Sequence, residues 1–337
     1  MLKKILFALI MSVFFIGIVS GCSESSDKEE GKGSGKQTVK IGYFPNLTHS
    51  ATIIALEKGF FEEEFGKDVT IETKTVANGG LFMEAMATKA IDVGTTGPGP
   101  LLNFYVKNKE YHLISGAVNG GAVLVSAGSS KISDLKDLDG KKVAIPVIGS
   151  TQDVMLRKAL KDVGLKPTTN GGSVELFASA PADTAALFVQ KQVDAAATQE
   201  PWGYVLENQA KGKLLLNWDE FAWGKDSPNT VVAASQNFLD KKGFSASYLK
   251  AHKKAVDFIQ NNPEESQELV IKHLKELTGK ELSKEEVAAA FSRLEVTTNV
   301  NEEVIQEMAD ISKEAGYIPS ADIKGLIDLS TLEEVSK

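Results

Sequence analysis

The segment VKIGYFPNLTHS, residues 39–50, decides the fold of this chain of 337 residues. Its apolar run from Val39 to Phe44 is typical of a strand, and Pro45-Asn46 ends that strand. The residues from Ser50 to Gly59 then show helical spacing. The segment therefore predicts a strand, a loop and a helix, which is the first step of an α/β unit.

The same unit occurs twice along the chain. The first copy continues with a strand, a helix and a strand at Val69–Thr75, Gly80–Lys89 and Ile91–Gly94. The second copy has strands and helices in the same order at Lys142–Ile145, Gln152–Val163, Ser173–Ala178, Pro181–Lys191 and Val193–Ala196. Lys40 and Asp92 are 52 positions apart, as are Lys142 and Asp194. This equal spacing predicts two α/β lobes of similar architecture.

The remaining elements indicate how the lobes connect. One more apolar run, Thr230 to Ala234, is followed mostly by helices. The simplest topology enters the second lobe after Val125 and returns near Pro228. It assigns residues 38–125 plus 230–337 to lobe 1 and residues 126–229 to lobe 2. Two crossing segments form a hinge, and a hinge over a cleft is suited to closing on a ligand.

The N-terminus is typical of an exported protein. Lys3 and Lys4 precede an apolar run, Ile5 to Val19, that is shorter than the roughly 20 residues of a membrane-spanning helix. Small residues then lead to Cys22, a pattern similar to the bacterial lipobox. We therefore expect a signal peptide at 1–21, lipid attachment at Cys22, a flexible tether at 22–37 and an extracytoplasmic location on the cell membrane.

Composition narrows the range of partners. Signal cleavage would change the formal net charge from −8 to about −10, which argues against nucleic acid as a partner. Cys22 is the only cysteine, and the four histidines lack metal-ligand spacing. Because a nucleophile elbow is also missing from the sequence, we expect no metal, no cofactor and no catalytic residues.

Loops at the carboxyl ends of the predicted strands are the candidate ligand site, because α/β sheets bind ligands at that edge. Free N–H groups and the helix dipole at the following helix starts favour an anion, and neutral Ser, Thr and Asn side chains add donors. Arg157 and Arg293, the only arginines, lie away from these loops. The candidate ligand-binding residues are Asn46, Thr48, His49, Thr95, Thr96, Gly97, Asn119, Gly120, Gly149, Ser150, Thr151, Gln152, Glu200 and Trp202.

Several of these residues also allow a purely structural role. Ser150 can cap its helix in a capping box with Asp153, and Asn119-Gly120 can be a plain turn. Glu200 can accept a hydrogen bond from a ligand amine or anchor a loop amide. Trp202 can cover an apolar ligand tail or pack in the core.

Five segments together resemble the aliphatic sulfonate, taurine and nitrate substrate-binding proteins of ABC importers. They are Ile41–His49, Lys58–Phe61, Ile91–Gly94 with Gly97-Pro98, Gly120–Ala122, and Asp194-Ala195 with Glu200-Pro201. The resemblance implies a type II periplasmic-binding fold with two α/β lobes joined by two crossing segments, and delivery of ligand to ABC permease subunits. It also implies that Asn46, Thr48, Thr95, Thr96 and residues 149–152 face the cleft.

The expected function is therefore capture of a small anion, with an aliphatic sulfonate favoured, by a monomeric receptor without catalysis. Taurine, nitrate or bicarbonate, and a thiamine-precursor pyrimidine remain alternative ligands. A pyrimidine-synthase-like enzyme on the same fold is the alternative of another class.

Overall fold

The computed structural model describes residues 36–279 and 281–337. The predicted signal peptide, Cys22 and nearly all of the predicted tether lie outside these residues. The first strand, β1, begins at Gln37, one residue before the expected start of the folded body.

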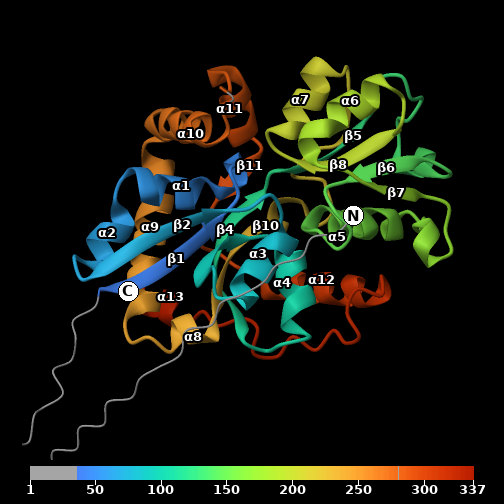
Figure 1. The fold of residues 1–337 in the computed structure, drawn as a ribbon. Coiled ribbons are helices and arrows are strands. Elements are labelled where there is room, and N and C mark those ends of the chain that lie inside the picture. Colours follow the sequence, from blue (N-terminus) through green and yellow to red (C-terminus); the bar gives the residue numbers. More distant parts are fainter. Residues whose placement is uncertain (1–35, 280) are drawn as a thin grey trace, which may run out of the picture. The chain divides into compact units, whose positions relative to one another are not determined.

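The first sheet has six strands in the order β11-β4-β10-β3-β1-β2 (Figure 1). Strands β2 and β3 pair in parallel with β1, whereas β10 is antiparallel to both β3 and β4. The bounds are β1 Gln37–Tyr43, β2 Val69–Thr75, β3 Val93–Thr96, β4 Tyr111–Gly120, β10 Pro228–Ser235 and β11 Leu294–Val296.

The second sheet has five strands in the order β7-β6-β8-β5-β9. Strands β7 and β8 pair in parallel with β6, and β5 is antiparallel to both β8 and β9. The bounds are β5 Ala122–Ser126, β6 Lys142–Ile145, β7 Glu175–Ala178, β8 Ala195–Gln199 and β9 Lys213–Leu216. Both sheets thus have a parallel group of three strands followed by an antiparallel strand.

The internal repeat predicted from the sequence has a direct structural counterpart. The Lys40 N–H donates to Asp92 Oδ2 at 3.0 Å, and the Lys142 N–H donates to Asp194 Oδ2 at 2.9 Å. In return, the N–H of each aspartate donates to the carbonyl of its lysine at 2.8 Å. The 52-residue spacing therefore joins the start of the third strand to the first strand in the same way in both lobes.

The first crossing lies earlier than the sequence predicted. Residues Ala122–Ser126 pair with β8 in the second sheet, so the chain leaves the first sheet at Gly120-Gly121 and not after Val125. The second crossing runs into Pro228, the first residue of β10. The crossing strands β5 and β10 each lie beside the third parallel strand of their sheet.

Helices cover both faces of each sheet (Figure 1). Helix α5 has its own N-cap in Ser150, and Pro98 stands in the first turn of α4, where it lacks only an N–H that a helix leaves free. The helix bounds are α1 Ser50–Glu57, α2 Phe60–Phe65, α3 Gly79–Ala87, α4 Pro98–Tyr105, α5 Thr151–Asp162, α6 Thr184–Val189, α7 Trp202–Gln209, α8 Gln236–Leu239, α9 Phe244–Asn261, α10 Pro263–Thr278, α11 Lys284–Phe291, α12 Glu302–Glu314 and α13 Ser330–Val335.

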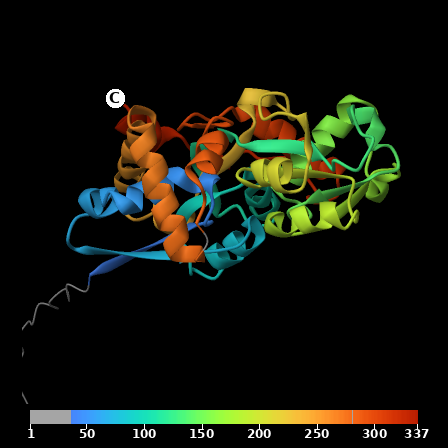
Figure 2. The same cartoon turned by 90° about the horizontal axis from the view of Figure 1, so that it is seen from above.

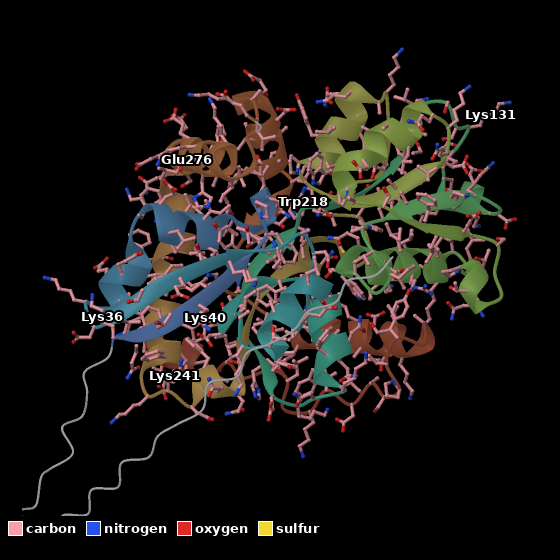
Figure 3. All side chains as sticks on the ribbon, viewed as in Figure 1. Lys36, Lys40, Lys131, Trp218, Lys241 and Glu276 are labelled. Atoms are coloured by element: carbon pink, nitrogen blue, oxygen red, sulfur yellow. The ribbon has the colours of Figure 1, made fainter. Side chains whose placement is uncertain are left out.

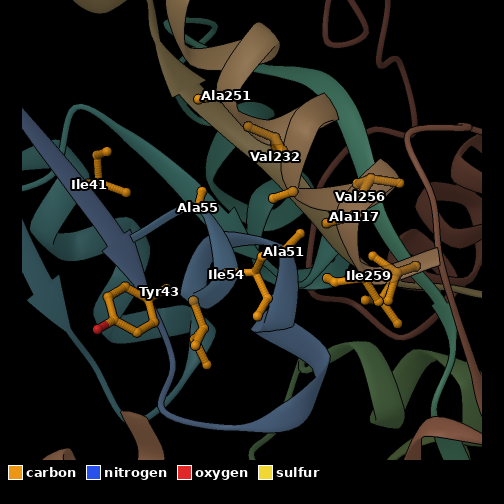
Figure 4. Close-up of a cluster of buried hydrophobic side chains, with 14 of the residues drawn as sticks. Ile41, Tyr43, Ala51, Ile54, Ala55, Ala117, Val232, Ala251, Val256 and Ile259 are labelled. Carbon is orange, nitrogen blue, oxygen red and sulfur yellow. The ribbon is translucent and has the colours of Figure 1, made fainter. Parts of the chain in front are cut away.

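The C-terminal helices bury the outer face of β1 and β4. Helix α9, orange in Figure 2, packs along α1 and α2. Figure 4 shows the core that results, where Ile41 and Tyr43 of β1 lie with Ile54 of α1 and Val256 of α9. The opposite face of the same sheet is covered by α3, α4 and α12 over a second buried cluster. The long C-terminal part of the chain therefore belongs to the first sheet, although it follows the second in sequence.

Within residues 36–279 and 281–337, we find no helix with the length and apolar character needed to span a bilayer.

Candidate functional site

A cavity of about 270 Å³ lies where loops from both sheets meet. The predicted residues that line it are Asn46, Thr48, His49, Gly97, Ser150, Thr151 and Gln152. They come from the loop after β1, the loop after β3 and the start of α5, as the strand-end rule predicts. Lys, Arg, Asp and Glu are missing among the described residues that line the cavity, so its polar surface is made of neutral groups.

The start of α5 presents free backbone donors to this cavity. Ser150 is the N-cap, and its Oγ accepts from the Asp153 N–H at 3.3 Å. The Asp153 carboxylate does not close the predicted capping box on Ser150. Instead, it accepts from the Gly149 N–H at 2.8 Å. Gly149 therefore holds the loop in place and does not line the cavity, while Ser150 both caps the helix and faces the cavity.

His49 is the only titratable side chain among the described residues that line the cavity. Its Nδ1 lies 2.8 Å from Thr95 Oγ1, and its ring lies 4.2 Å from the ring of Phe44 between centroids. Burial lowers the pKa of His49 from 6.5 to about 3, so the imidazole is neutral near pH 7. Thr95 thus orients His49 from behind and does not itself line the cavity.

The two lobes touch at the starts of α4 and α5. The Gly99 N–H donates to Thr151 Oγ1 at 3.3 Å, and Asn103 Nδ2 donates to the Gly149 carbonyl at 3.1 Å. A Cβ on Gly99 would lie 3.0 Å from Thr151 N and 3.1 Å from Gly149 O. The missing side chain at Gly99 therefore allows the two helix starts to approach closely enough to close one side of the cavity.

A methyl group at this contact should weaken ligand binding. We expect Gly99→Ala to raise the Kd about tenfold, because overpacking costs about 1–3 kcal/mol and here it opposes closure of the lobes. Titration calorimetry with the best-binding ligand measures this change. Gly66→Ala is the stability control: no atom lies within 4 Å of its Cβ, but its φ is +77°, so alanine strains the backbone at the end of α2 and should leave the Kd unchanged. An unchanged Kd in a folded Gly99→Ala variant would show that this contact does not govern closure.

Glu200 lies in an ion-pair cluster outside the cavity. Its side chain is fully buried; Oε1 accepts from Arg293 at 2.9 Å and Oε2 accepts from the Tyr204 N–H at 3.1 Å. Burial raises the pKa of the Glu200 carboxyl, although Tyr204 and Arg293 act against that rise. Glu200 thus anchors a loop amide and joins α7 to Arg293 after α11, so it is not placed to contact a ligand in the cavity.

Asn119, Gly120 and Thr96 also lie off the cavity. Asn119 pairs with Pro228 and Glu295 in the first sheet. Gly120 has a φ of +68° and lies under the indole of Trp218, labelled in Figure 3, where an added Cβ would lie 2.1 Å from the ring. Thr96 is fully buried in β3. Asn119 and Gly120 are therefore not the plain turn that the sequence also allowed, because they are the last two residues of strand β4.

Trp202 lines a second, more apolar cavity of about 310 Å³. This cavity shares Phe44, Asn46, Pro181 and Gln199 with the polar one, so the two adjoin. Trp202 is partly exposed and stands at the start of α7, with Leu274 and Leu282 on the same lining. Trp202 thus lies on the wall of an apolar cavity, and its role beside an apolar ligand tail stays a prediction.

Several lining residues were not predicted from the sequence. Asn78 and Gly79 follow β2, and Pro146 and Val147 follow β6, so the strand-end rule applies to them as well. The remaining unpredicted residues are Phe44, Ala77, Pro100, Ala180, Pro181, Gln199, Asn229 and Thr230. Asn229 and Thr230 begin β10, and because β10 is antiparallel to β3, the start of β10 lies at the same edge as the end of β3.

The site can bind and enclose a small solute by hydrogen bonds to neutral groups. Helices α3, α4 and α5 begin at the cavity, and free N–H groups at helix starts favour negative charge. Within the described part of the chain, no group of three His, Cys, Asp or Glu side chains is placed to hold a metal ion.

Known proteins with similar sequences are binding proteins. A binding protein of Brucella abortus strain 2308 is 28% identical over 240 residues, which cover 70% of this chain and 72% of that protein. The taurine-binding periplasmic protein of Escherichia coli K12 is 28% identical over 207 residues, 59% of this chain and 61% of that protein.

Solved structures share the fold at lower identity. The alkanesulfonate-binding protein SsuA from Xanthomonas axonopodis pv. citri, bound to MOPS, has a TM-score of 0.72 and 21% identity, covering 86% of this chain and 98% of that one. The nitrate-binding protein NrtA from Synechocystis PCC 6803 has a TM-score of 0.68 and 16% identity, with coverage of 89% and 88%.

Two α/β lobes with matching strand orders, joined by two crossings beside a cavity, define this chain as having the periplasmic-binding-protein fold. The model of the NMT1-like family matches residues 32–273, which is most of the chain. The protein therefore belongs to the NMT1-like family.

Proposed function

We propose that this protein is an extracytoplasmic solute-binding protein of an ABC importer and captures a small anion in the cavity between its lobes. The fold, the family and the names of the relatives that bind taurine and alkanesulfonate support this proposal. The permease subunits of the importer are then its protein partners. Two crossings beneath the cavity suit a receptor that closes over its ligand.

We infer further that the ligand is an aliphatic sulfonate. The observation that carries this inference is the pairing of a neutral, donor-rich cavity with an apolar one. A sulfonate has three equivalent oxygens for the donors at the helix starts, and its alkyl tail fits beside Phe44 and Trp202. Nitrate and bicarbonate have no tail for the apolar cavity, and taurine would place an ammonium group there.

Attachment to the membrane is also a proposal. The sequence from Ile5 to Cys22 supports export and lipid modification at Cys22, and both features lie outside the described residues. Intact-mass measurement of the protein purified from a bacterial membrane tests it: a diacylglyceryl group on Cys22 supports the anchor, and an unmodified chain that begins at Met1 contradicts it.

We propose that the protein has no catalytic activity. His49 is the one titratable group on the described cavity lining, and it is neutral and hydrogen-bonded to Thr95. A pyrimidine-synthase-like reaction would require this histidine or another group to react. Incubation of pure protein with a bound ligand, followed by NMR, should return the ligand unchanged, and a new product would establish an enzyme.

A ligand series tests the substrate class. In thermal-shift assays a ligand at 100 times its Kd should add about 2.7 kcal/mol to stability. Alkanesulfonates from methane- to hexanesulfonate should bind with a Kd that falls about fourfold for each methylene, since burying one contributes about 0.8 kcal/mol. Taurine, nitrate, bicarbonate and a neutral pyrimidine complete the series. Stabilisation by the pyrimidine alone would overturn the anion proposal, and stabilisation by nitrate alone would overturn the sulfonate.

A further inference from the structure

An amide pair at the cavity joins the two lobes. Asn229, the second residue of β10, lines the cavity and is 4% exposed. Its Oδ1 accepts from Nε2 of Gln152 at 2.8 Å. Gln152 is 6% exposed and belongs to the first turn of α5 in the second lobe. The hydrogen bond between these two side chains therefore exists only while the lobes are together.

The Nδ2 group of Asn229 has no hydrogen-bond partner among the described residues. A buried N–H without an acceptor is costly, and native proteins pair nearly all such groups with protein, water or ligand. Asn229 is held by Gln152 through its only acceptor atom, so the atom left for another molecule is a donor. Because Asn229 lines the cavity, a donor on this residue that lacks a protein partner is suited to an anionic oxygen of the ligand.

The same pair can also present an acceptor. If both amides turned over, Gln152 Oε1 would accept from Asn229 Nδ2 and Asn229 Oδ1 would be free. The neighbouring lining groups favour the first arrangement. Ser150 begins a helix whose free N–H groups attract a negatively charged ligand. No Lys or Arg is among the described lining residues to balance the charge of such a ligand. Side-chain amide donors are then needed beside the backbone donors.

We infer that the Asn229 amide is a specificity-determining donor to the anionic group of the ligand, and that Gln152 orients it across the gap between the lobes. This inference rests on the proposed function. It extends that function in two ways. The Asn229 amide rejects ligands that have a hydrogen-bond donor facing it, and its orientation depends on closure of the two lobes.

Asn229→Asp is the central test, with pentanesulfonate as the probe. The aspartate has the same shape and still accepts from Gln152, but its second atom is a charged acceptor that repels the anion. We expect the Kd to rise at least about 100-fold, since a hydrogen bond to a charged group is lost and repulsion is added. Asn237→Asp, at an exposed position of α8, adds the same charge elsewhere and should leave the Kd unchanged.

The neutral variant Asn229→Ala keeps the test valid if the aspartate variant does not fold, and we expect its Kd to rise about tenfold. Combining it with Gln152→Leu gives a double-mutant cycle. A combined loss clearly smaller than the sum of the single losses supports orientation by Gln152, and additive losses overturn it.

The outcomes separate the two proposals. Wild-type protein that binds no anion defeats the proposed function. Wild-type protein that binds pentanesulfonate while Asn229→Asp keeps its Kd within threefold defeats only the present inference. Tighter binding of a neutral pyrimidine with a hydrogen-bond donor by Asn229→Asp than by the wild type would support the donor role, because the aspartate accepts where the wild-type amide donates.

Discussion

Replacing Asp153 with alanine should lower the free energy of unfolding by about 3–5 kcal/mol, the usual effect of breaking a buried ion pair. The Asp153 side chain is fully buried, and Oδ1 accepts from Arg157 Nε at 2.9 Å. Without the carboxylate, Arg157 stays buried with an uncompensated charge, and the Gly149 N–H loses its acceptor. Urea unfolding of the ligand-free protein measures the change.

A third residue strengthens this expectation. Tyr317, which follows α12 of the first lobe, donates its hydroxyl hydrogen to Asp153, and its oxygen accepts from Arg157 at 2.6 Å. Burial and the Asp153 carboxylate raise the pKa of Tyr317, so the hydroxyl stays protonated. The cluster therefore connects the first lobe to the loop that positions Ser150. Ligand affinity of Asp153→Ala should fall together with stability.

The matched control is Asp162→Ala on the same helix. Asp162 pairs with Lys158 at 2.7 Å, but its side chain is 49% exposed, and exposed pairs contribute less than about 1 kcal/mol. The two variants remove the same side chain from an ion pair spaced four residues apart on the same helix. If Asp153→Ala destabilises no more than Asp162→Ala, the buried cluster does not hold the lobes together as we argue.

The sequence predicted the two lobes because each repeats one local pattern, and local patterns determine which segments form strands and helices. It placed the first crossing incorrectly for a reason that is also physical. Strands β4 and β5 follow one another with only Gly121 between them, and both are mostly buried. Their partners, β10 and β8, are distant in sequence, so no nearby residue indicates that the strands join different sheets.

The candidate site was predictable where a parallel strand ends in a loop, as at Asn46, Gly97 and Ser150. Asn229 could not be predicted in this way because it stands at the start of an antiparallel strand. The place of that strand in the sheet depends on the strand order, which the local sequence does not indicate. Glu200 was predicted to face the cleft because its partner, Arg293, is 93 residues away and could not be recognised from the local sequence. Long-range pairs of this kind decide whether a polar residue faces a ligand or the protein interior.

Acidification from pH 7 to pH 5 should lower the free energy of unfolding by about 4 kcal/mol through two buried histidines. Burial lowers the pKa of His49 to about 3 and the pKa of His252 to about 4, from 6.5 in the unfolded chain. Between pH 6.5 and these values the unfolded chain binds protons that the folded protein does not. Stability is therefore complete above pH 6.5 and falls as the pH falls, by about 1.4 kcal/mol per unit for each histidine.

His252 can be tested without disturbing the cavity. It is fully buried between α9 and β4, where its Nε2 lies 2.9 Å from the Gly116 carbonyl. His252→Met should shift stability by a constant amount from the lost hydrogen bond, and should remove about half of the decrease between pH 7 and pH 5. Urea unfolding at several pH values gives this slope.

Two carboxyl groups with shifted pKa values, Glu57 and Glu200, must be separated from the effect of His252 on the pH dependence of stability. Glu57 has a lowered pKa and acts below 4.5, outside this range, while Glu200 has a raised pKa and opposes the histidines. Both act equally in the wild type and in His252→Met, so the difference between the two slopes isolates His252. Tyr248→Phe changes the ring stacked on His252 but adds no titration here, and should keep the wild-type slope. A His252→Met slope equal to that of Tyr248→Phe would mean that His252 takes up its proton in the folded state, and that its burial does not resist acid.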